Sequence, residues 1–200
     1  MPLRAGMVRW PGDPEVRISQ VADMAAGDVC NLTHLDMSAH TGTHMDAPRH
    51  FTRDGESMSA WRAEDTVGRC RVVEILDPVA IRAEEVRACG PRAGEILLFK
   101  TRNSGLPNGS FCEQFVYLAA DAARVLAEAR VRTVGIDYLS IGGFANDLVE
   151  THVIVLGAGI WVIEGLCLEG VGAGEYELCC LPLRVEGADG APARALLRKV

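Results

Sequence analysis

The chain has 200 residues, 48% of them hydrophobic, and this size and apolar content predict one domain spanning residues 1–200 with a sizeable core. The net charge is −7 with only two lysines, which argues against nucleic-acid binding because phosphate neutralisation needs clustered positive charge. The N-terminus lacks the apolar segment of a signal peptide, and no apolar run approaches the ~20 residues of a membrane span. We therefore expect a cytoplasmic protein.

Short runs rich in Val, Ile and Leu are typical of strands. In chain order, strands are expected over residues 32–38, 71–76, 95–100, 133–137, 159–164 and 176–185. Helices are expected over residues 81–89, which Gly90 can cap, and over 118–130, where apolar residues recur at helical spacing. Residues 146–156 form either a third helix or a turn that continues into a strand. The pattern predicts an α/β or α+β domain with a strand-rich core.

The seven cysteines are odd in number and form no Cys-x-x-Cys pair. This usage argues against a disulfide framework or a cysteine-based metal site. We expect free and mostly buried thiols, as in a protein of a reducing compartment.

The densest group of candidate metal ligands lies between His40 and His50, in the segment His-Thr-Gly-Thr-His-Met-Asp-Ala-Pro-Arg-His. It holds three of the five histidines of the chain and one carboxylate, Asp46. Imidazole and carboxylate groups are ligands that zinc and manganese accept in proteins. An isolated His-x3-His pair is most often structural, but the addition of Asp46 and His50 makes a divalent-metal site the leading hypothesis.

The backbone has to bend within this segment if His40 and His44 are to bind one ion. In a straight strand they would lie about 13 Å apart, at about 3.3 Å per residue, whereas metal–nitrogen bonds measure about 2.0–2.1 Å. Gly42 lies between them and supplies permissive backbone for the bend. His44 and Asp46 are two residues apart and can point the same way from a short extended piece.

Residues outside this core complete the candidate site. Pro48 suits the first turn of a helix, which would bring His50 near the ligands as an acid or base. His152 is the only histidine after position 50, and Glu164 ends a strongly apolar run, where a carboxylate is costly unless a cation or hydrogen bonds compensate. A metal ion would do so; the alternatives are a structural His152 and an arginine partner for Glu164. Trp10, in the turn Trp-Pro-Gly-Asp, is expected to be exposed, where it either walls an aromatic pocket or simply packs.

Together these residues resemble the cyclase-like family of metal-dependent hydrolases, which includes the bacterial kynurenine formamidases. The family signature His-x-Gly-Thr-His-x-Asp-x-Pro-x-His stands unbroken at residues 40–50. The resemblance extends over nearly the whole chain, through the turn at 10–13, Gly-Ile-Asp-Tyr-Leu-Ser at 135–140, and the segments at 174–178 and 181–183.

This resemblance implies a swivelling β/α/β fold, a homodimer or higher homo-oligomer, and one or two divalent ions, commonly zinc and in some members manganese. The implied metal ligands are His40, His44, Asp46, His152 and Glu164. Asp46 would bridge two ions where both are bound, His50 would donate and accept the proton, and Trp10 would contact an aromatic substrate.

The implied reaction is hydrolysis of an aryl formamide such as N-formylkynurenine, a step of tryptophan catabolism, by a metal-bound hydroxide. Formamidases proper tend to carry Thr-Pro-Ser where this chain has Tyr138-Leu139-Ser140, and often a second histidine where it has Thr151. An isatin-hydrolase-like enzyme that opens a cyclic amide and a metal-binding member without turnover remain alternatives. A non-haem iron oxygenase with a 2-His-1-carboxylate triad is a further rival, but it would leave three candidate site residues without a role.

Overall fold

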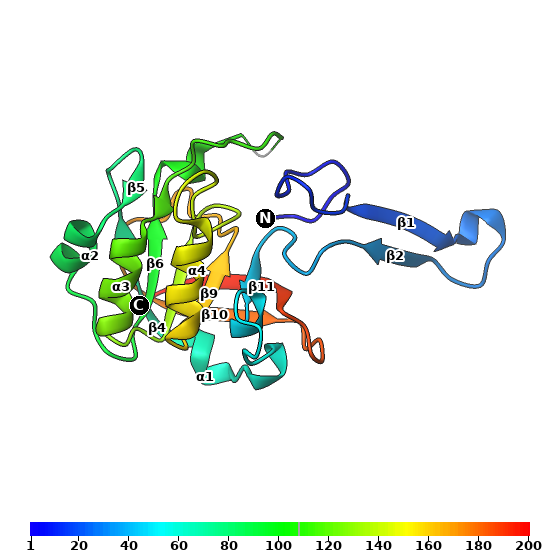
Figure 1. Ribbon diagram of the computed structural model, residues 1–200. Coiled ribbons are helices and arrows are strands. Elements are labelled where there is room, and N and C mark those ends of the chain that lie inside the picture. Colours follow the sequence, from blue (N-terminus) through cyan, green and yellow to red (C-terminus); the bar gives the residue numbers. More distant parts are fainter. Residues whose placement is uncertain (108) are drawn as a thin grey trace.

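The computed structural model describes residues 1–107 and 109–200. Its centre is a closed barrel with the strand order β10-β11-β3-β9-β8-β6-β4 (Figure 1). The barrel strands are β3 (His44–Asp46), β4 (Val67–Glu74), β6 (Ile96–Lys100), β8 (Thr133–Ile136), β9 (Trp161–Glu164), β10 (Gly174–Pro182) and β11 (Gly190–Lys199). Neighbours from β4 through β6 and β8 to β9 run parallel, and the other pairs are antiparallel. The fold is therefore a mixed α/β fold built on a mixed barrel.

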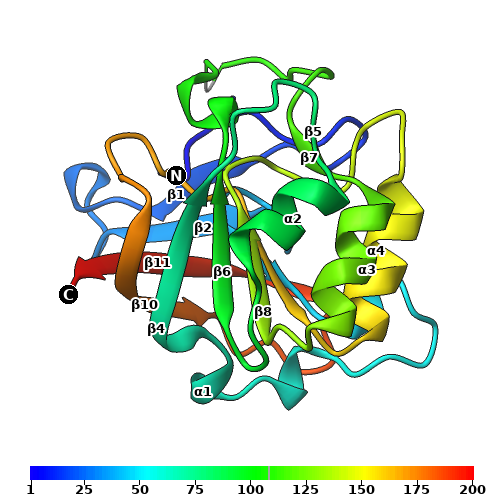
Figure 2. The same cartoon turned by 90° about the vertical axis from the view of Figure 1, so that its left-hand side faces the viewer.

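Helices cover one side of this barrel (Figure 2). The helices are α1 (Ala63–Thr66), α2 (Ala83–Cys89), α3 (Ala120–Glu128) and α4 (Leu148–Gly157). Helix α3 contacts both α2 and α4, so these three form the covering layer. The short strands β5 (Ala80–Ile81) and β7 (Tyr117–Leu118) pair with each other in parallel beside that layer.

Two apolar cores lie on opposite faces of the barrel wall, and strand β6 contributes to both. Ile96 and Leu98 belong to the core inside the barrel, whereas Leu97 and Phe99 belong to the core beneath the helices. Successive side chains of a strand point to opposite faces, so a strand buried on both sides needs a continuous apolar run. The same alternation decides where the side chains of β3 and β9 point.

The N-terminal segment forms an arm that leaves the body of the molecule (Figure 1). Strands β1 (Arg17–Ala22) and β2 (Leu32–Asp36) pair antiparallel and make no ladder with the barrel. Between residues 17 and 36 only Ala22 and Asp23 are not exposed.

Most of the expected elements are confirmed. Strands occur at all six expected places, both helices form, Gly90 caps α2 with φ +59°, and the segment at 146–156 is helical. The strand at 32–38 does not lead into the histidine segment, because β2 ends at Asp36 and belongs to the arm. The closed barrel and strands β1 and β11 were not predicted. The swivelling β/α/β arrangement stays a prediction.

The thiols are free, as expected, but the expectation that they are mostly buried is wrong. Only Cys70 and Cys180 are buried, while Cys30 and Cys167 are exposed. Cys30 lies on the arm and Cys167 in the loop after β9, which are positions that an apolar sequence pattern does not reveal. Within the described residues, no helix has the length and hydropathy to cross a bilayer. A cytoplasmic location stays a prediction.

Candidate metal centre

Strand β3 directs its two candidate ligands away from the barrel interior. Met45 and Ala47 pack in the interior core, so the alternating His44 and Asp46 face the other way, and both side chains are fully buried. Across the ladder, His44 pairs with Glu164 at the end of β9. The register of two antiparallel strands thus brings residues 120 positions apart in sequence to one point.

The bend predicted between His40 and His44 is present. Gly42 has φ +67°, a left-handed conformation that favours glycine. The loop after β9 packs against it so closely that a Cβ at Gly165 would lie 2.1 Å from the Gly42 carbonyl oxygen. The hydroxyl of Thr43 also donates a hydrogen bond to the Gly165 carbonyl, at 2.6 Å. With the backbone folded back, the His40 and His44 ring centroids lie only 5.0 Å apart.

Main-chain carbonyls fix the orientation of two buried imidazoles. Nδ1 of His44 lies 3.0 Å from the carbonyl two residues earlier, and Nδ1 of His152 lies 2.6 Å from the carbonyl one turn earlier in α4. A carbonyl oxygen only accepts, so both Nδ1 atoms carry a proton, and in the neutral rings both Nε2 atoms present a lone pair. Nε2 of His44 lies 3.2 Å from Glu164 Oε2 and 3.4 Å from Asp46 Oδ1, and Nε2 of His152 lies 3.3 Å from Glu164 Oε1. These lone pairs and carboxylates converge as metal ligands do.

Two buried polar atoms in this cluster have no hydrogen-bond partner, namely His44 Nε2 and Asp46 Oδ2. The carboxylate oxygens near His44 Nε2 lie close to it but make no hydrogen bond with it. Leaving a buried polar atom unsatisfied costs about 1–3 kcal/mol, so native structures retain such atoms for a reason. A bound cation would satisfy both atoms.

The donor set suits one or two divalent ions. Ligand atoms of His40, Asp46 and His50 lie within 4.8 Å of one another, and so do those of His44, Asp46 and Glu164. Asp46 is common to both groups, as a bridging carboxylate would be. Imidazole nitrogen and carboxylate oxygen together match the preferences of zinc and manganese. The residues present therefore fit the divalent metal that the sequence predicts.

The electrostatics of the cluster also call for a cation. Burial acts to lower the pKa of His44, but its contacts with Asp46 and Glu164 outweigh burial and raise the pKa to about 10. Burial acts to raise the pKa of Asp46, but the imidazoles of His40 and His44 hold it well below its usual range. The carboxylates thus stay ionised and attract either protons on the imidazoles or a metal ion that replaces them.

Glu164 has no arginine beside it within the described chain, so the salt-bridge alternative is wrong. Its Oε1 accepts a hydrogen bond of 2.6 Å from the main-chain N–H of Ile141, and both oxygens face imidazoles. His152 is likewise buried, at 2% exposure, and its ring stacks on Phe51 with centroids 4.2 Å apart.

His50 follows Pro48 in a short 3-10 turn (Pro48–His50), with the proline in the first turn as expected. Its ring stacks on that of His40 at 3.9 Å between centroids. Burial lowers the pKa of His50, which favours the neutral imidazole that can accept a proton. Its place beside His40 and Asp46 also admits a role as metal ligand, so its assignment as acid and base stays a prediction.

A pocket of about 180 Å³ opens over these groups. Its apolar lining comes from Trp10, Phe51, Leu139 and Leu148. Trp10 is half-buried rather than exposed as expected, because its ring packs edge-on against two phenylalanines at centroid distances of 5.2 and 5.5 Å. It both packs and walls the pocket.

Sequence reasoning missed two residues of the site. Phe51 follows the signature directly and supplies the stacking partner of His152. Asp189 lies 139 positions after His50, yet its Oδ2 lies 3.2 Å from His50 Nδ1 and 3.0 Å from His40 Nε2. Nothing around Asp189 marked it, because only the pairing of β11 with β3 brings it to the site.

A sequence model of the family described as "Putative cyclase" matches residues 1–142, more than half of the chain. The chain belongs to the cyclase family. A kynurenine formamidase of Salinibacter ruber (strain DSM 13855 / M31) is 36% identical over 191 residues, covering 94% of this chain and 90% of the relative. The predicted membership is confirmed, with the similarity extending over almost the full length.

Solved structures of cyclase-family proteins match the fold. One described as a potential metal-dependent hydrolase with cyclase activity has a TM-score of 0.88 and 33% identity, covering 100% of this chain and 96% of that chain. Isatin hydrolase A from Labrenzia aggregata has a TM-score of 0.79 and 22% identity, covering 98% of this chain and 88% of that chain, a likeness that concerns the fold alone. The expectation of a metal-dependent hydrolase of carbon–nitrogen bonds other than peptide bonds is confirmed at the level of the family.

Proposed function

We propose that this protein is an arylformamidase that hydrolyses N-formylkynurenine or a similar aryl formamide. The observation that carries this proposal is the convergence of four imidazoles and two buried carboxylates at a pocket walled by Trp10. At about 180 Å³ the pocket is smaller than the ~300–1,000 Å³ typical of larger ligands, which suits a substrate with one aromatic ring. The similarity to kynurenine formamidases supports the same substrate class.

We assign the metal to His40, His44, Asp46, His152 and Glu164, with zinc as the first candidate ion and manganese as the second. A divalent ion held there would polarise the formyl carbonyl and lower the pKa of a water molecule. The main-chain hydrogen bonds to His44 and His152 fix both rings with Nε2 directed into the cluster, where these atoms would bind the ion. Asp46 contributes a carboxylate to both groups of ligands.

His50 is the proton carrier of the proposed reaction. With Nδ1 held by Asp189, its neutral ring presents the Nε2 lone pair, which accepts a proton from the attacking water. The same nitrogen then returns the proton to the departing amine nitrogen, so the neutral aromatic amine and formic acid leave, and the acid releases its own proton to solvent to become formate. Trp10 and Leu139 form apolar walls that position the aromatic ring and exclude water.

The proposal is tested by incubating zinc-loaded and manganese-loaded protein with N-formylkynurenine and with isatin in parallel, using chelator-treated protein as the control. We expect formate release from N-formylkynurenine that disappears with the chelator. Ring opening of isatin alone would replace the formamidase assignment by that of a cyclic amidase. A metal-loaded protein inactive on both substrates would contradict the proposed function.

We further propose that the protein is a homodimer joined through the arm. The arm exposes six large apolar side chains, and a two-stranded hairpin alone is marginally stable in water. These side chains are Ile18, Val21, Met24, Val29, Leu32 and Leu35. The arm spans residues 17–36, twenty in all, close to the ~20–30 residues that each partner contributes to a standard interface.

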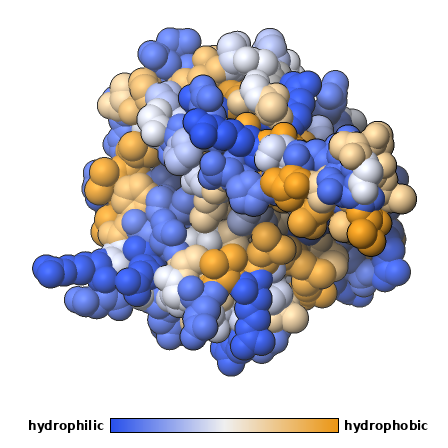
Figure 3. Space-filling view, turned by 90° about the vertical axis from the view of Figure 1, so that its right-hand side faces the viewer, coloured by the Kyte–Doolittle hydropathy of each residue, from blue (hydrophilic) through white to orange (hydrophobic). Residues whose placement is uncertain are grey.

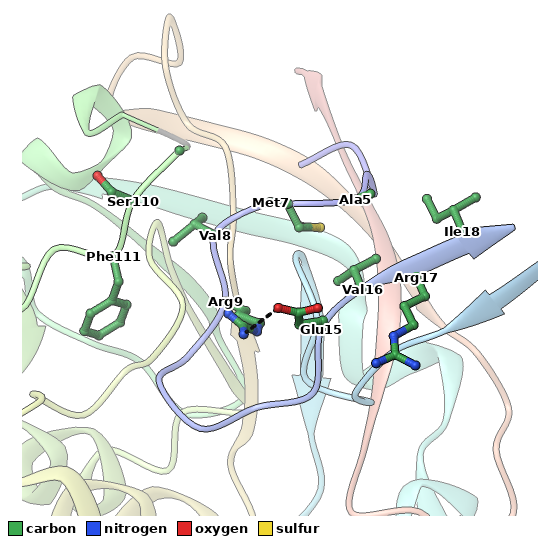
Figure 4. Close-up of a pocket in the computed structure, with 12 residues that line it drawn as sticks. Ala5, Met7, Val8, Arg9, Glu15, Val16, Arg17, Ile18, Ser110 and Phe111 are labelled. Atoms are coloured by element: carbon green, nitrogen blue, oxygen red, sulfur yellow. Dashed lines mark ion pairs between the residues drawn. The ribbon is translucent and has the colours of Figure 1, made fainter.

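The surface around the arm also suits a second copy. Figure 3 looks onto the face from which the arm projects, where apolar patches interrupt the polar surface. At the root of the arm lies a pocket of about 560 Å³ whose lining includes Met7, Val16 and Phe111 (Figure 4). The ion pair between Arg9 and Glu15 crosses its lining at 3.6 Å.

Sedimentation equilibrium tests the dimer. We expect a dimer for the wild type and a monomer for the double variant Ile18→Asp/Leu35→Asp, whose two positions pair across the hairpin. Leu76→Asp is the matched control, because Leu76 is an exposed apolar residue outside the arm. A monomeric wild type at micromolar concentration would contradict the proposal.

A further inference from the structure

The loop before β11 delivers a carboxylate to the site without lining the substrate pocket. The main-chain carbonyl of Asp189 accepts a hydrogen bond of 2.9 Å from the N–H of Ala47, the residue after β3. The next residue, Gly190, pairs with Asp46. The backbone of Asp189 is therefore pinned directly beside the candidate ligands.

Gly190 shows how closely this loop fits the site. A Cβ at Gly190 would lie 2.5 Å from Cε1 of His40 and 2.9 Å from the Met45 carbonyl oxygen. No side chain fits there unless the imidazole or the strand moves. The close approach lets the carboxylate of the preceding residue reach around the His40 ring.

One oxygen of Asp189 holds two histidines. Its Oδ2 lies 3.0 Å from Nε2 of His40 and 3.2 Å from Nδ1 of His50, and the two rings stack with their planes 24° apart. A carboxylate oxygen has two lone pairs and accepts from both N–H groups. The single oxygen thus sets the orientation of both rings.

For His50 this hydrogen bond selects the tautomer. A proton on Nδ1, donated to Asp189, leaves the lone pair on Nε2, where the proposed reaction needs it. For His40, Nδ1 is the nitrogen that faces Asp46, at 2.9 Å, so Nε2 is free to donate to Asp189. A carboxylate that receives the second N–H of a metal-ligating histidine fixes its ring and raises its basicity.

We propose that Asp189 is a positioning residue that fixes the tautomer and orientation of His50 while supporting His40. This inference rests on the proposed function for its kinetic consequences but not for its structural ones. Asp189 does not line the substrate pocket, so its loss acts on turnover and leaves substrate binding intact.

The first test is kinetic, with zinc-loaded Asp189→Ala and Asp189→Asn. Loss of partners of this kind typically costs 10–100-fold in activity or metal affinity. We expect kcat of Asp189→Ala to fall about 10–100-fold with KM changed less than about threefold, and Asp189→Asn to fall less because its amide oxygen still accepts. Glu186→Gln, in the same exposed loop, is the matched control and should keep wild-type kinetics. An unchanged kcat in Asp189→Ala would overturn the proposal.

The second test does not depend on turnover. Long-range ¹H–¹⁵N spectra report which nitrogen of each imidazole is protonated, and His50→Gln assigns the His50 signals among the five histidines. We expect Nδ1-protonated His50 in the zinc-loaded wild type and a shift towards Nε2 protonation in Asp189→Ala. If the tautomer does not change, or if bound zinc falls in proportion to kcat, Asp189 does not position His50 and the proposal fails. Failure of the proposed function alone would leave this spectroscopic result unaffected.

Discussion

Metal binding should stabilise this fold strongly, because the metal-free cluster contains unsatisfied buried atoms. His44 Nε2 and Asp46 Oδ2 both lack a hydrogen-bond partner. At about 1–3 kcal/mol for each atom, the metal-free protein carries a penalty of about 2–6 kcal/mol that a bound ion removes. Mass action gives the same size of effect, because a ligand at about 1,000 times its Kd raises the free energy of unfolding by about 4 kcal/mol. For a chain of this size, 1 kcal/mol shifts the melting temperature by about 2–4 °C, so we expect zinc to raise Tm by about 8–16 °C.

Calorimetry of chelator-dialysed protein, with and without buffered zinc, measures this shift. His44→Ala removes one of the unsatisfied atoms and one proposed ligand, and its shift should shrink to a few degrees. His34→Ala is the matched control, since His34 is exposed on β2 in the arm and should leave the full shift. Equal shifts in the wild type and His44→Ala, or no shift in the wild type, would refute the argument from the buried atoms.

Four further outcomes are expected. His50→Ala should lower kcat about 10²–10⁴-fold while retaining bound zinc, and equal loss of zinc would make His50 a ligand. Burial lowers the pKa of His50, and the neutral form of His50 is the proposed base. We therefore expect kcat/KM to fall with decreasing pH only below about 6.5, and a decrease in kcat/KM that begins at a higher pH would contradict this. Trp10→Ala should raise KM about tenfold or more, with little change in bound zinc measured on the same sample. Asp137→Ala removes the acceptor of four hydrogen bonds and should cost about 3 kcal/mol, or about 6–12 °C in Tm, whereas the exposed Asp54→Ala should cost almost nothing.

The sequence indicates the clustering of the candidate ligands where they lie close together in the chain. His40, His44, Asp46 and His50 fall within eleven residues, and the need for a bend at Gly42 follows from bond lengths alone. Among the distant residues, His152 was identified as the only histidine after position 50, and Glu164 because its chemistry conflicts with its surroundings. A carboxylate at the end of an apolar run requires compensation.

Residues whose chemistry suits their local sequence were not identified from the sequence. Asp189 lies between Gly187 and Gly190 in a polar loop, where an aspartate is common. Strand β11 was missed because its Ala- and Arg-rich sequence has low strand propensity, and its pairing with β10 and β3 imposes the strand. Barrel closure depends on that strand, so neither the barrel nor the approach of Asp189 could be derived from local patterns.

The strand register that brings Asp189 to the site also places the other candidate ligands. The three residues of the short strand β3 pair with β9 on one side and with β11 on the other. Each of these two neighbouring strands carries a carboxylate of the site at its end or directly beside it. Glu164 ends β9 opposite His44, and Asp189 directly precedes Gly190, the β11 residue that pairs with Asp46. A slip of one residue in either ladder would turn these side chains to the other face of the sheet. The barrel therefore specifies the candidate metal centre through strand register, and only the histidine segment specifies it locally.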